Sequence, residues 1–398
     1  GNTDGNGYGV FQYEPPSGFL TMCTANLSEP DIGPNSTTNC TDHFNWLYYT
    51  GDASSTRAIT GLGFQPDLSV FHQLNNTSAK VWYDSSRGVN KMLQSTSTAA
   101  EDDSSQYGYL SAFGADGFTA QAGTTNNNYI NENAKNIISY HWKANGASTT
   151  TNDASATSIG DIDSVYQANT TAGFSIVKYT GNGADSTDVE VAHGLGAAPT
   201  AVIVKNMTDA NRWQVYHESL SADGSYTKKN VLLNTTAAES GYSSQIKAVS
   251  STTFTLRDVD ADGNANVLKS SSEYIAYCFR SIDGYSKFGK YLGNAASDGT
   301  YIWLGFRPSM IFVKMISSTE NWLGVDSKRP GYNPTGNYLF WNLTNAEGGT
   351  NAQDEYFDIT ASGFKIRTTG ASANSAQTYI YFAWAEAPFK YATGFGVQ

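Results

Sequence analysis

Short apolar runs, each bounded by glycine, proline or small polar residues, follow one another along the whole chain. One group of these runs occurs three times, beginning near Gly61, Gly194 and Leu304. In each copy a glycine-rich turn leads to a proline, an apolar strand, a polar turn and a second strand that carries a tryptophan. The landmark residues of the three copies are Pro66, Pro199 and Pro308, and Trp82, Trp213 and Trp322. The spacing from proline to tryptophan is 16 residues in the first copy and 14 in the other two.

The copies recur at a period of roughly 110 to 130 residues, which is too long for a solenoid repeat of about 20 to 50 residues. Each copy is therefore expected to be a whole domain. The predicted division is an extended lead that ends a preceding module (1–45), repeat 1 (46–145), a linker (146–171), repeat 2 (172–283) and repeat 3 (284–398). The abrupt start suggests the ordered or processed part of something longer.

The apolar runs predict an all-β protein. Strand-length segments are separated by turn signals such as Asp116-Gly117, and no amphipathic segment of about 11 residues lies between them. We expect three tandem antiparallel β-sandwiches of jelly-roll type, with an immunoglobulin-like sandwich as the alternative. Each sheet is expected to turn one face toward its partner sheet and the other toward water, and the three sandwiches to form a rigid stalk.

Composition narrows the class of partner. Aromatic residues are abundant at 13% and charged residues sparse at 15%, which argues against disorder. The formal net charge of −12 would repel a phosphate backbone, so a nucleic-acid partner is not expected. No apolar run approaches the roughly 20 residues of a membrane span, so membrane insertion is not expected either.

The best metal-like string is Asp258-Val-Asp260-Ala-Asp262-Gly263-Asn264, which matches the first half of a calcium loop. The twelfth position, where that loop needs glutamate, is Lys269. The string is absent from the other two copies. A solvated turn is the competing interpretation, and calcium is the one cofactor considered. The five scattered histidines match no zinc motif.

No catalytic residues are predicted, and no phosphate loop or nucleophile elbow occurs in the sequence. A glycosidase would need two carboxylates about 5 to 10 Å apart. The candidates for such a pair are Asp84, Glu101, Asp102, Asp103, Asp326 and Glu386. Asp84 and Asp326 recur after the landmark tryptophan, and the simpler interpretation is that they cap turns.

Aromatic side chains divide into expected core and expected surface groups. The landmark tryptophans are predicted to fill the sandwich cores, because their alternation keeps each on one face of its strand. Loop tyrosines are the candidates for contact with a glycan or another partner. They are Tyr107, Tyr109, Tyr129, Tyr242 and Tyr332.

Three cysteines do not make a disulfide framework. Cys278 lies within the apolar run YIAYCF and is expected to be a buried thiol. Cys23 and Cys40 could pair if the protein matures outside a reducing compartment.

Many ordered strings resemble one repeat family. They include FQYEPPSGFL, YYTGD, GLGFQPDLSVF, TAAEDD, FSIVKYTGNG, HGLGAAPTAVIVK, YIAYCF, GYSKFGKYLGN, GFRPSMIFVK and AEAPFKYA. Nearly the whole chain is similar to repeats in tail-fibre and other virion proteins of tailed bacteriophages, where a SPRY-like sandwich often precedes them. The PPSGF lead resembles the final strand of such a sandwich.

The resemblance implies a non-enzymatic structural protein on the external surface of a virion. The expected function is a tail fibre or appendage, commonly a homotrimer, that contacts other virion proteins and attaches to host cell-surface polysaccharide. The alternatives are a capsid decoration or head-fibre protein without a receptor role, and a tailspike enzyme that degrades polysaccharide.

Overall fold

The structure is a computed structural model. It describes residues 1–23, 26, 30–33, 37–103, 105–125, 129–222, 228–241, 245–259, 267–329, 332–348 and 356–386. The predicted all-β class is confirmed: strands dominate, and the helices are η2 (Cys40–Asp42), α1 (Ala154–Thr157) and α2 (Ala371–Asn374). None of the helices in these ranges is long and apolar enough to cross a membrane.

Each copy of the sequence pattern supplies eight corresponding strands, and the second copy adds two more. Copy 1 contains β1 (Phe44–Thr50), β2 (Thr56–Thr60), β3 (Leu68–Gln73), β4 (Val81–Asp84), β5 (Leu93–Gln94), β6 (Tyr109–Gly114), β7 (Gly117–Gln121) and β8 (Asn136–Trp142). Copy 2 contains β9 (Thr150–Asn152), β10 (Ser164–Asn169), β11 (Phe174–Thr180), β12 (Asp188–Ala192), β13 (Ala201–Asn206), β14 (Trp213–His217), β15 (Val231–Leu232), β16 (Gln245–Val249), β17 (Thr253–Arg257) and β18 (Glu273–Phe279). Copy 3 contains β19 (Ser286–Leu292), β20 (Tyr301–Trp303), β21 (Pro308–Met315), β22 (Trp322–Asp326), β23 (Leu339–Phe340), β24 (Phe357–Thr360), β25 (Gly363–Ile366) and β26 (Thr378–Ala385).

The strand order is the same in all three copies. Copy 1 has a large sheet of order β1-β8-β3-β4-β5 and a small sheet of order β2-β7-β6, and the predicted Asp116-Gly117 turn joins β6 to β7. Copy 3 repeats this with β19-β26-β21-β22-β23 and β20-β25-β24. Copy 2 has β11, β18, β13, β14 and β15 in the same order, extended at one edge by β10 and β9. All pairings within these sheets are antiparallel.

Residues 146–171 carry structure that the lack of periodicity did not predict. This stretch contains β9, α1 and β10, and β10 pairs with β11 over its whole length. The strands lie at an edge of the large sheet, where a few backbone hydrogen bonds suffice and no regular apolar alternation is needed.

In copies 1 and 2 the small sheet covers one face of the large sheet. The core between them in copy 1 is built from both sheets, with Phe71 and Ile137 from the large sheet and Phe118 and Leu110 from the small one. A separate core between the corresponding strands of copy 2 includes Val204 and Phe254. These apolar interfaces confirm the layered sandwich character of the chain.

The opposite face of each large sheet is not turned to water, which corrects the sequence expectation. It packs on the other two copies, so that strands β3, β13 and β21 are buried at every residue. This double burial explains the apolar runs AVIV of β13 and MIFV of β21, because a strand covered on both faces has no solvent side that requires polar residues.

A triangle of aromatic rings joins the three large sheets. Trp142, Phe279 and Trp384 occupy matching positions near the ends of the closing strands β8, β18 and β26. Their ring centroids are 6.1 Å apart for the first two, 5.7 Å for the last two and 5.2 Å for the two tryptophans. One continuous hydrophobic core therefore contains residues of all three copies.

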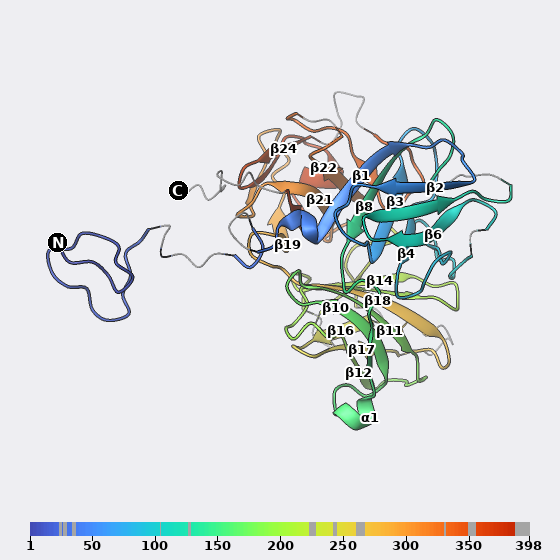
Figure 1. Ribbon diagram of the computed structural model, residues 1–398, viewed down its shortest axis with the longest axis horizontal. Helices are drawn as coiled ribbons and strands as arrows, with labels where there is room; N and C mark the ends of the chain where they lie inside the picture. Colours follow the sequence, from blue (N-terminus) through green and yellow to red (C-terminus); the bar gives the residue numbers. More distant parts are fainter. Residues whose placement is uncertain are drawn as a thin grey trace.

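The copies consequently surround a common centre instead of following one another along a stalk. In Figure 1, copy 1 lies at the upper right, copy 2 below and copy 3 at the upper left, while the N-terminal loop lies apart from them.

In the N-terminal loop, the Asp4 carboxylate accepts the amides of Asn6, Tyr8 and Thr21.

Candidate functional site

The recurring carboxylates lie at the contacts between copies. In copy 1, Asp84 ends β4 and is fully buried. Its Oδ1 accepts the Arg87 amide at 2.9 Å, and its Oδ2 accepts Arg87 Nε at 2.5 Å and the Tyr277 hydroxyl of copy 2 at 2.7 Å. Glu101 accepts Arg87 Nη1 at 3.2 Å. The corresponding residues of copy 3 are Asp326, Arg329 and Glu347, joined by Tyr140 of copy 1.

Each of these clusters of aspartate, arginine, glutamate and a tyrosine from another copy joins two copies and is called the lock. Burial, and then the Asp84 carboxylate, raise the pKa of Tyr277 well above its usual value, so the hydroxyl stays protonated and donates. Burial works to lower the pKa of Arg87, but Asp84, Tyr277 and Glu101 together hold it above its usual value. Asp84 is fully buried and both of its oxygens accept hydrogen bonds, so this carboxylate is held within the contact between copies 1 and 2.

Copy 2 replaces the lock with an apolar version. His217 stands in the ladder position of Asp84, and Leu220 stands where the arginine would be. The facing residue from copy 3 is Phe382, whose ring centroid lies 5.1 Å from that of His217. Burial lowers the pKa of His217 to about 3, so the imidazole is neutral. Copy 2 thus lacks the carboxylate, the guanidinium and the tyrosine hydroxyl together, which avoids a buried unpaired charge.

A loop of sequence Thr-x-Ala-Glu reaches from each copy to the next. In copy 1, the Thr98 carbonyl accepts the Asn211 amide of copy 2 at 2.7 Å, and the Glu101 amide donates to the Met207 carbonyl at 2.9 Å. Copies 2 and 3 make the same two contacts. Between copies 2 and 3, the Glu320 amide donates to the Thr236 carbonyl and the Glu239 amide to the Ile316 carbonyl. Between copies 3 and 1, the Ser78 amide donates to the Thr344 carbonyl and the Glu347 amide to the Leu74 carbonyl. Copy 1 thus contacts copy 2, copy 2 contacts copy 3, and copy 3 contacts copy 1.

A buried lysine reinforces each of these loops. Lys205 Nζ donates to the Thr98 carbonyl at 3.0 Å, and Lys314 Nζ donates to the Thr236 carbonyl at 3.0 Å. In copy 1 the ammonium comes from Lys80 and reaches the Asn345 carbonyl at 2.8 Å. Each lysine therefore satisfies carbonyl groups of a neighbouring copy.

The landmark tryptophan of copy 1 occupies a different position on its strand from those of copies 2 and 3. Trp213 and Trp322 face Lys205 and Lys314 across the strand pair, and each indole donates to a neighbouring copy's carbonyl at 2.9 Å, that of Gln94 or Leu232. Trp82 instead faces Val70, two residues further along the ladder. Its ring packs on Trp213 and Trp341. The three tryptophans are all buried, but they fill the contacts between copies. Each landmark proline lies two residues before the residue that pairs with Asp84, His217 or Asp326 on the neighbouring strand.

We expect the buried lysines to make stability rise with pH. Burial lowers the pKa of Lys205 to about 7, against about 10.4 in an unfolded chain. Between these values the unfolded state binds more protons, so the free energy of unfolding increases with pH. Chemical denaturation from about pH 7 to 8.5 should show this rise, and Lys205→Met should reduce its slope by up to about 1 kcal/mol per pH unit.

The control for this measurement is Lys290→Met, which removes a lysine from an exposed position of β19. The Lys290 variant should keep the wild-type slope. An unchanged slope in the Lys205 variant would contradict a buried, proton-losing ammonium.

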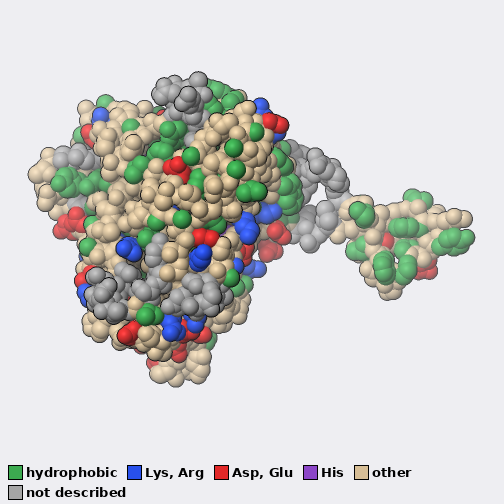
Figure 2. All heavy atoms as spheres, turned by 180° about the vertical axis from the view of Figure 1, so that it is seen from behind, with side chains coloured by type: hydrophobic (Ala, Val, Ile, Leu, Met, Phe, Trp, Pro, Cys, Tyr) green, Lys and Arg blue, Asp and Glu red, His purple; other side chains and the backbone are tan. Residues whose placement is uncertain are grey.

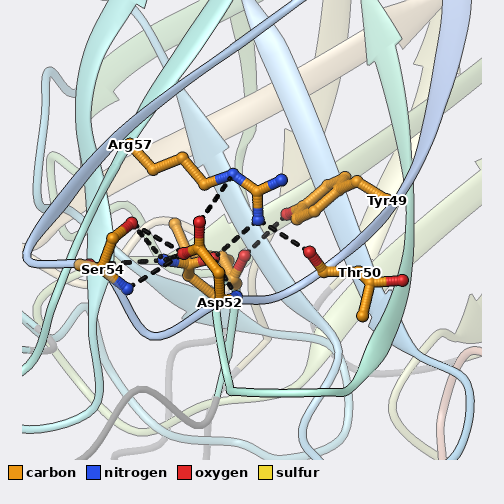
Figure 3. Close-up of polar contacts among 7 residues, drawn as sticks. Tyr49, Thr50, Asp52, Ser54 and Arg57 are labelled. Carbon is orange, nitrogen blue, oxygen red and sulfur yellow. Dashed lines mark hydrogen bonds and ion pairs between the residues drawn. The ribbon is translucent and has the colours of Figure 1, made fainter.

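A hydrogen-bonded surface cluster surrounds Asp52 in copy 1. Figure 3 shows Arg57 lying between Asp52, Thr50 and the Tyr49 ring. Arg57 Nε is 3.5 Å from Asp52 Oδ2, and its Nη1 donates to the Thr50 carbonyl at 2.7 Å. Asp52 Oδ1 also accepts the amide and hydroxyl of Ser54.

Two parts of this arrangement, the tyrosine hydrogen bond and the following glycine, recur in the other copies and therefore belong to the fold. The sequence is Tyr-x-Gly followed by Asp or Asn. The tyrosine hydroxyl donates to a carbonyl just before the closing strand in each copy, from Tyr49 to Ile130, Tyr179 to Val267 and Tyr291 to Ala373. A Cβ on the following glycine, Gly51, would lie 2.0 Å from the Glu132 carbonyl oxygen. Only glycine permits this close approach, which the other two copies repeat at Gly181 and Gly293.

The predicted contact tyrosines do not gather into one site. Tyr107 and Tyr129 form a partly buried T-shaped pair with centroids 5.3 Å apart, and Tyr109 is partly buried beside the core of copy 1. Tyr332 is 75% exposed. Tyr242 lies outside the described residues. Among the exposed aromatics that sequence reasoning missed are Tyr301 and Trp303 of β20. Their alternation around Ile302 was the available signal.

Most of the predicted calcium loop, including Asp260 and Asp262, lies outside the described residues. Asp258 is buried, and its Oδ2 accepts the Leu268 amide at 2.8 Å. In the described part of the chain, no three His, Cys, Asp or Glu residues lie together as metal ligands would. Cys23 and Cys40 are free thiols here, and Cys278 is buried as expected.

Comparison with known proteins gives one match. The family described as Domain of unknown function (DUF7483) matches residues 39–388. This range includes every strand of the three copies and leaves out most of the N-terminal loop. Neither the curated proteins nor the solved structures give a match. The chain therefore belongs to the DUF7483 family, whose conserved unit spans all three copies together.

Proposed function

We propose that this chain is a non-enzymatic structural protein on the outside of a tailed-bacteriophage virion, in a tail fibre or appendage that attaches to host-surface glycan. The proposal rests on the structural role of the recurring residues. The Tyr-x-Gly turns, the Thr-x-Ala-Glu loops and the Asp-Arg pairs all hold strands or copies together. Architecture explains their recurrence, which supports a structural role for the repeated residues.

We further propose that each copy is a jelly-roll-like sandwich. The order of the first, eighth and third strands in one sheet, with the second and seventh adjacent in the other, is that of a jelly roll. The fourth and fifth strands depart from it, because they stay in the large sheet as hairpin neighbours. A family unit that spans residues 39–388 supports three sandwiches functioning as one block.

The surface supports attachment through many weak polar contacts. Figure 2 shows a face on which uncharged polar side chains and backbone predominate, with charges of both signs scattered among them. Such a surface suits a polysaccharide, and several chains per particle would multiply modest affinities. A homotrimer that contacts other virion proteins is the proposed assembly.

One observation favours a second candidate, a capsid decoration or head-fibre protein without a receptor role. The closed set of contacts among the copies gives a rounded block, whereas a fibre shaft would be extended (Figure 1). The rounded shape suits a particle that sits on a surface.

Gold-labelled antibodies against the purified protein, imaged on phage particles by electron microscopy, separate these candidates. Label on tail appendages is expected, label on the head would establish the second candidate, and unlabelled particles would overturn both. Sedimentation of the purified chain tests the trimer. Release of reducing sugar from host polysaccharide, lost on a single Asp or Glu substitution, would establish a tailspike enzyme instead.

A further inference from the structure

Two aromatic side chains on β20 are exposed without a structural reason. Tyr301 is 44% exposed and Trp303 57% exposed, while Ile302 between them is buried. β20 is the outer strand of the small sheet of copy 3, and the alternation of a strand puts both rings on the outer face of that sheet. Of the eight tryptophans, seven are buried or half-buried. Two exposed aromatic rings side by side offer a flat apolar surface with polar edges, which suits contact with a ligand.

The fold does not require these rings. Strand pairing identifies their counterparts, because β2, β12 and β20 pair in the same way with β7, β17 and β25. The counterparts of Tyr301 are Ala58 and Glu190, and those of Trp303 are Thr60 and Ala192. Copy 3 thus carries aromatic rings where the other copies carry small or charged side chains. A feature confined to one of three copies that share a strand order points to function.

Neighbouring groups hold the rings in place. Lys287 Nζ lies 4.3 Å from the centroid of the Trp303 ring and donates to the Trp303 carbonyl at 3.3 Å. The Tyr301 hydroxyl is 2.8 Å from the Ser362 hydroxyl. Opposite Trp303 on β25 stands Gly363, which has no side chain to cover the indole. The rings are therefore fixed before any ligand arrives, which reduces the entropy lost on binding.

The surroundings favour a saccharide over a protein. The aromatic row is two residues long, and the same small sheet carries charged side chains close by, including the ion pair of Lys365 with Asp298 at 2.6 Å. A protein interface of ordinary size would need a broad apolar centre from which charged residues are depleted. A sugar has apolar C–H faces that stack on an aromatic ring and hydroxyls that bond to charged and polar side chains.

We propose that Trp303, flanked by Tyr301, is the stacking platform of a carbohydrate-binding site on the outer face of the small sheet in copy 3. The sugar would stack on the indole, and its hydroxyl groups would reach side chains of β25 such as Lys365. This inference rests on the proposed function, since it names the residues and ligand class of the glycan attachment.

The test is binding of the full chain to an array of immobilised bacterial O-antigen and capsular saccharides. We expect wild type to bind a subset, Trp303→Ala to bind at least about tenfold more weakly, and Trp303→Phe to retain most binding through its ring. The control is Tyr48→Ala, which removes an exposed aromatic of copy 1 and should bind as wild type. A bound saccharide should also shield wild-type fluorescence from acrylamide quenching, because Trp303 is the most exposed indole.

Equal binding by wild type and Trp303→Ala would overturn the inference, as would a wild-type protein that binds no saccharide. Binding of a protein component of the host envelope that depends on Trp303 would overturn it as well. These results are distinguishable from failure of the proposed function. Labelled virions without saccharide binding would overturn only the inference, whereas Trp303-dependent binding by a protein absent from the virion would overturn only the virion assignment.

Discussion

Replacing Asp84 by alanine is expected to destabilise the whole protein by about 3 to 5 kcal/mol, because it leaves a buried guanidinium without its main partner. The Arg87 side chain is 1% exposed and is 2.5 Å from Asp84 through Nε. Removal of the carboxylate also takes the acceptor from the Tyr277 hydroxyl of copy 2. Chemical denaturation monitored by tryptophan fluorescence measures the loss.

The chain itself supplies the matched control. Copy 2 uses histidine, leucine and a facing phenylalanine in place of the Asp, Arg and Tyr of the lock. The triple variant Asp84→His, Arg87→Leu, Tyr277→Phe should therefore recover much of the stability that Asp84→Ala loses. If the triple variant is as unstable as the single one, the charges are not exchanged as a unit and the interpretation of the lock is wrong.

Trp384→Ala is expected to lower the unfolding temperature of all three copies at once. The substitution opens a cavity in the aromatic triangle and should cost about 3 to 5 kcal/mol. Trp384 contacts Trp142 of copy 1, Phe279 of copy 2 and Phe288 of its own copy at centroid distances of 5.2 to 5.7 Å. Because one core joins the copies, differential scanning calorimetry should show a single transition in both proteins.

Trp303→Ala is the control, since it removes an exposed indole and should leave the transition where it is. A Trp384 variant with two transitions, one of them at the wild-type temperature, would show that the copies unfold independently. That outcome would refute the shared core.

Local structure was largely predictable from the sequence. Apolar runs bounded by turn residues identified most strands, and Asp116-Gly117 identified a hairpin, because turn chemistry and strand alternation act over a few residues. The strands missed were β9 and β10, which add to an edge of the copy 2 sheet and need little apolar surface. The capping role of Asp84 was predictable as well, since it involves the next three residues.

The partners of the recurring side chains could not be predicted in the same way. Tyr277 and Asp84 are 193 residues apart in the chain, and nothing near either one specifies the other. The surroundings of the candidate glycan-contact tyrosines were equally hidden: Tyr107 and Tyr129 look like separate loop residues but pack on each other. Trp303 resembles a core tryptophan until the strand pairing shows which face it occupies.

The sequence by itself determined that the protein is all-β and that one strand pattern occurs three times. It also carried a sign of deeper burial, since strands such as β13 and β21 have too few polar residues for a sheet with one solvent-exposed face. Only the tertiary structure decided that the copies close around one another. The physical reason is that apolar periodicity records which residues avoid water, whereas the choice of neighbour depends on complementary shape and charge brought together by the whole fold.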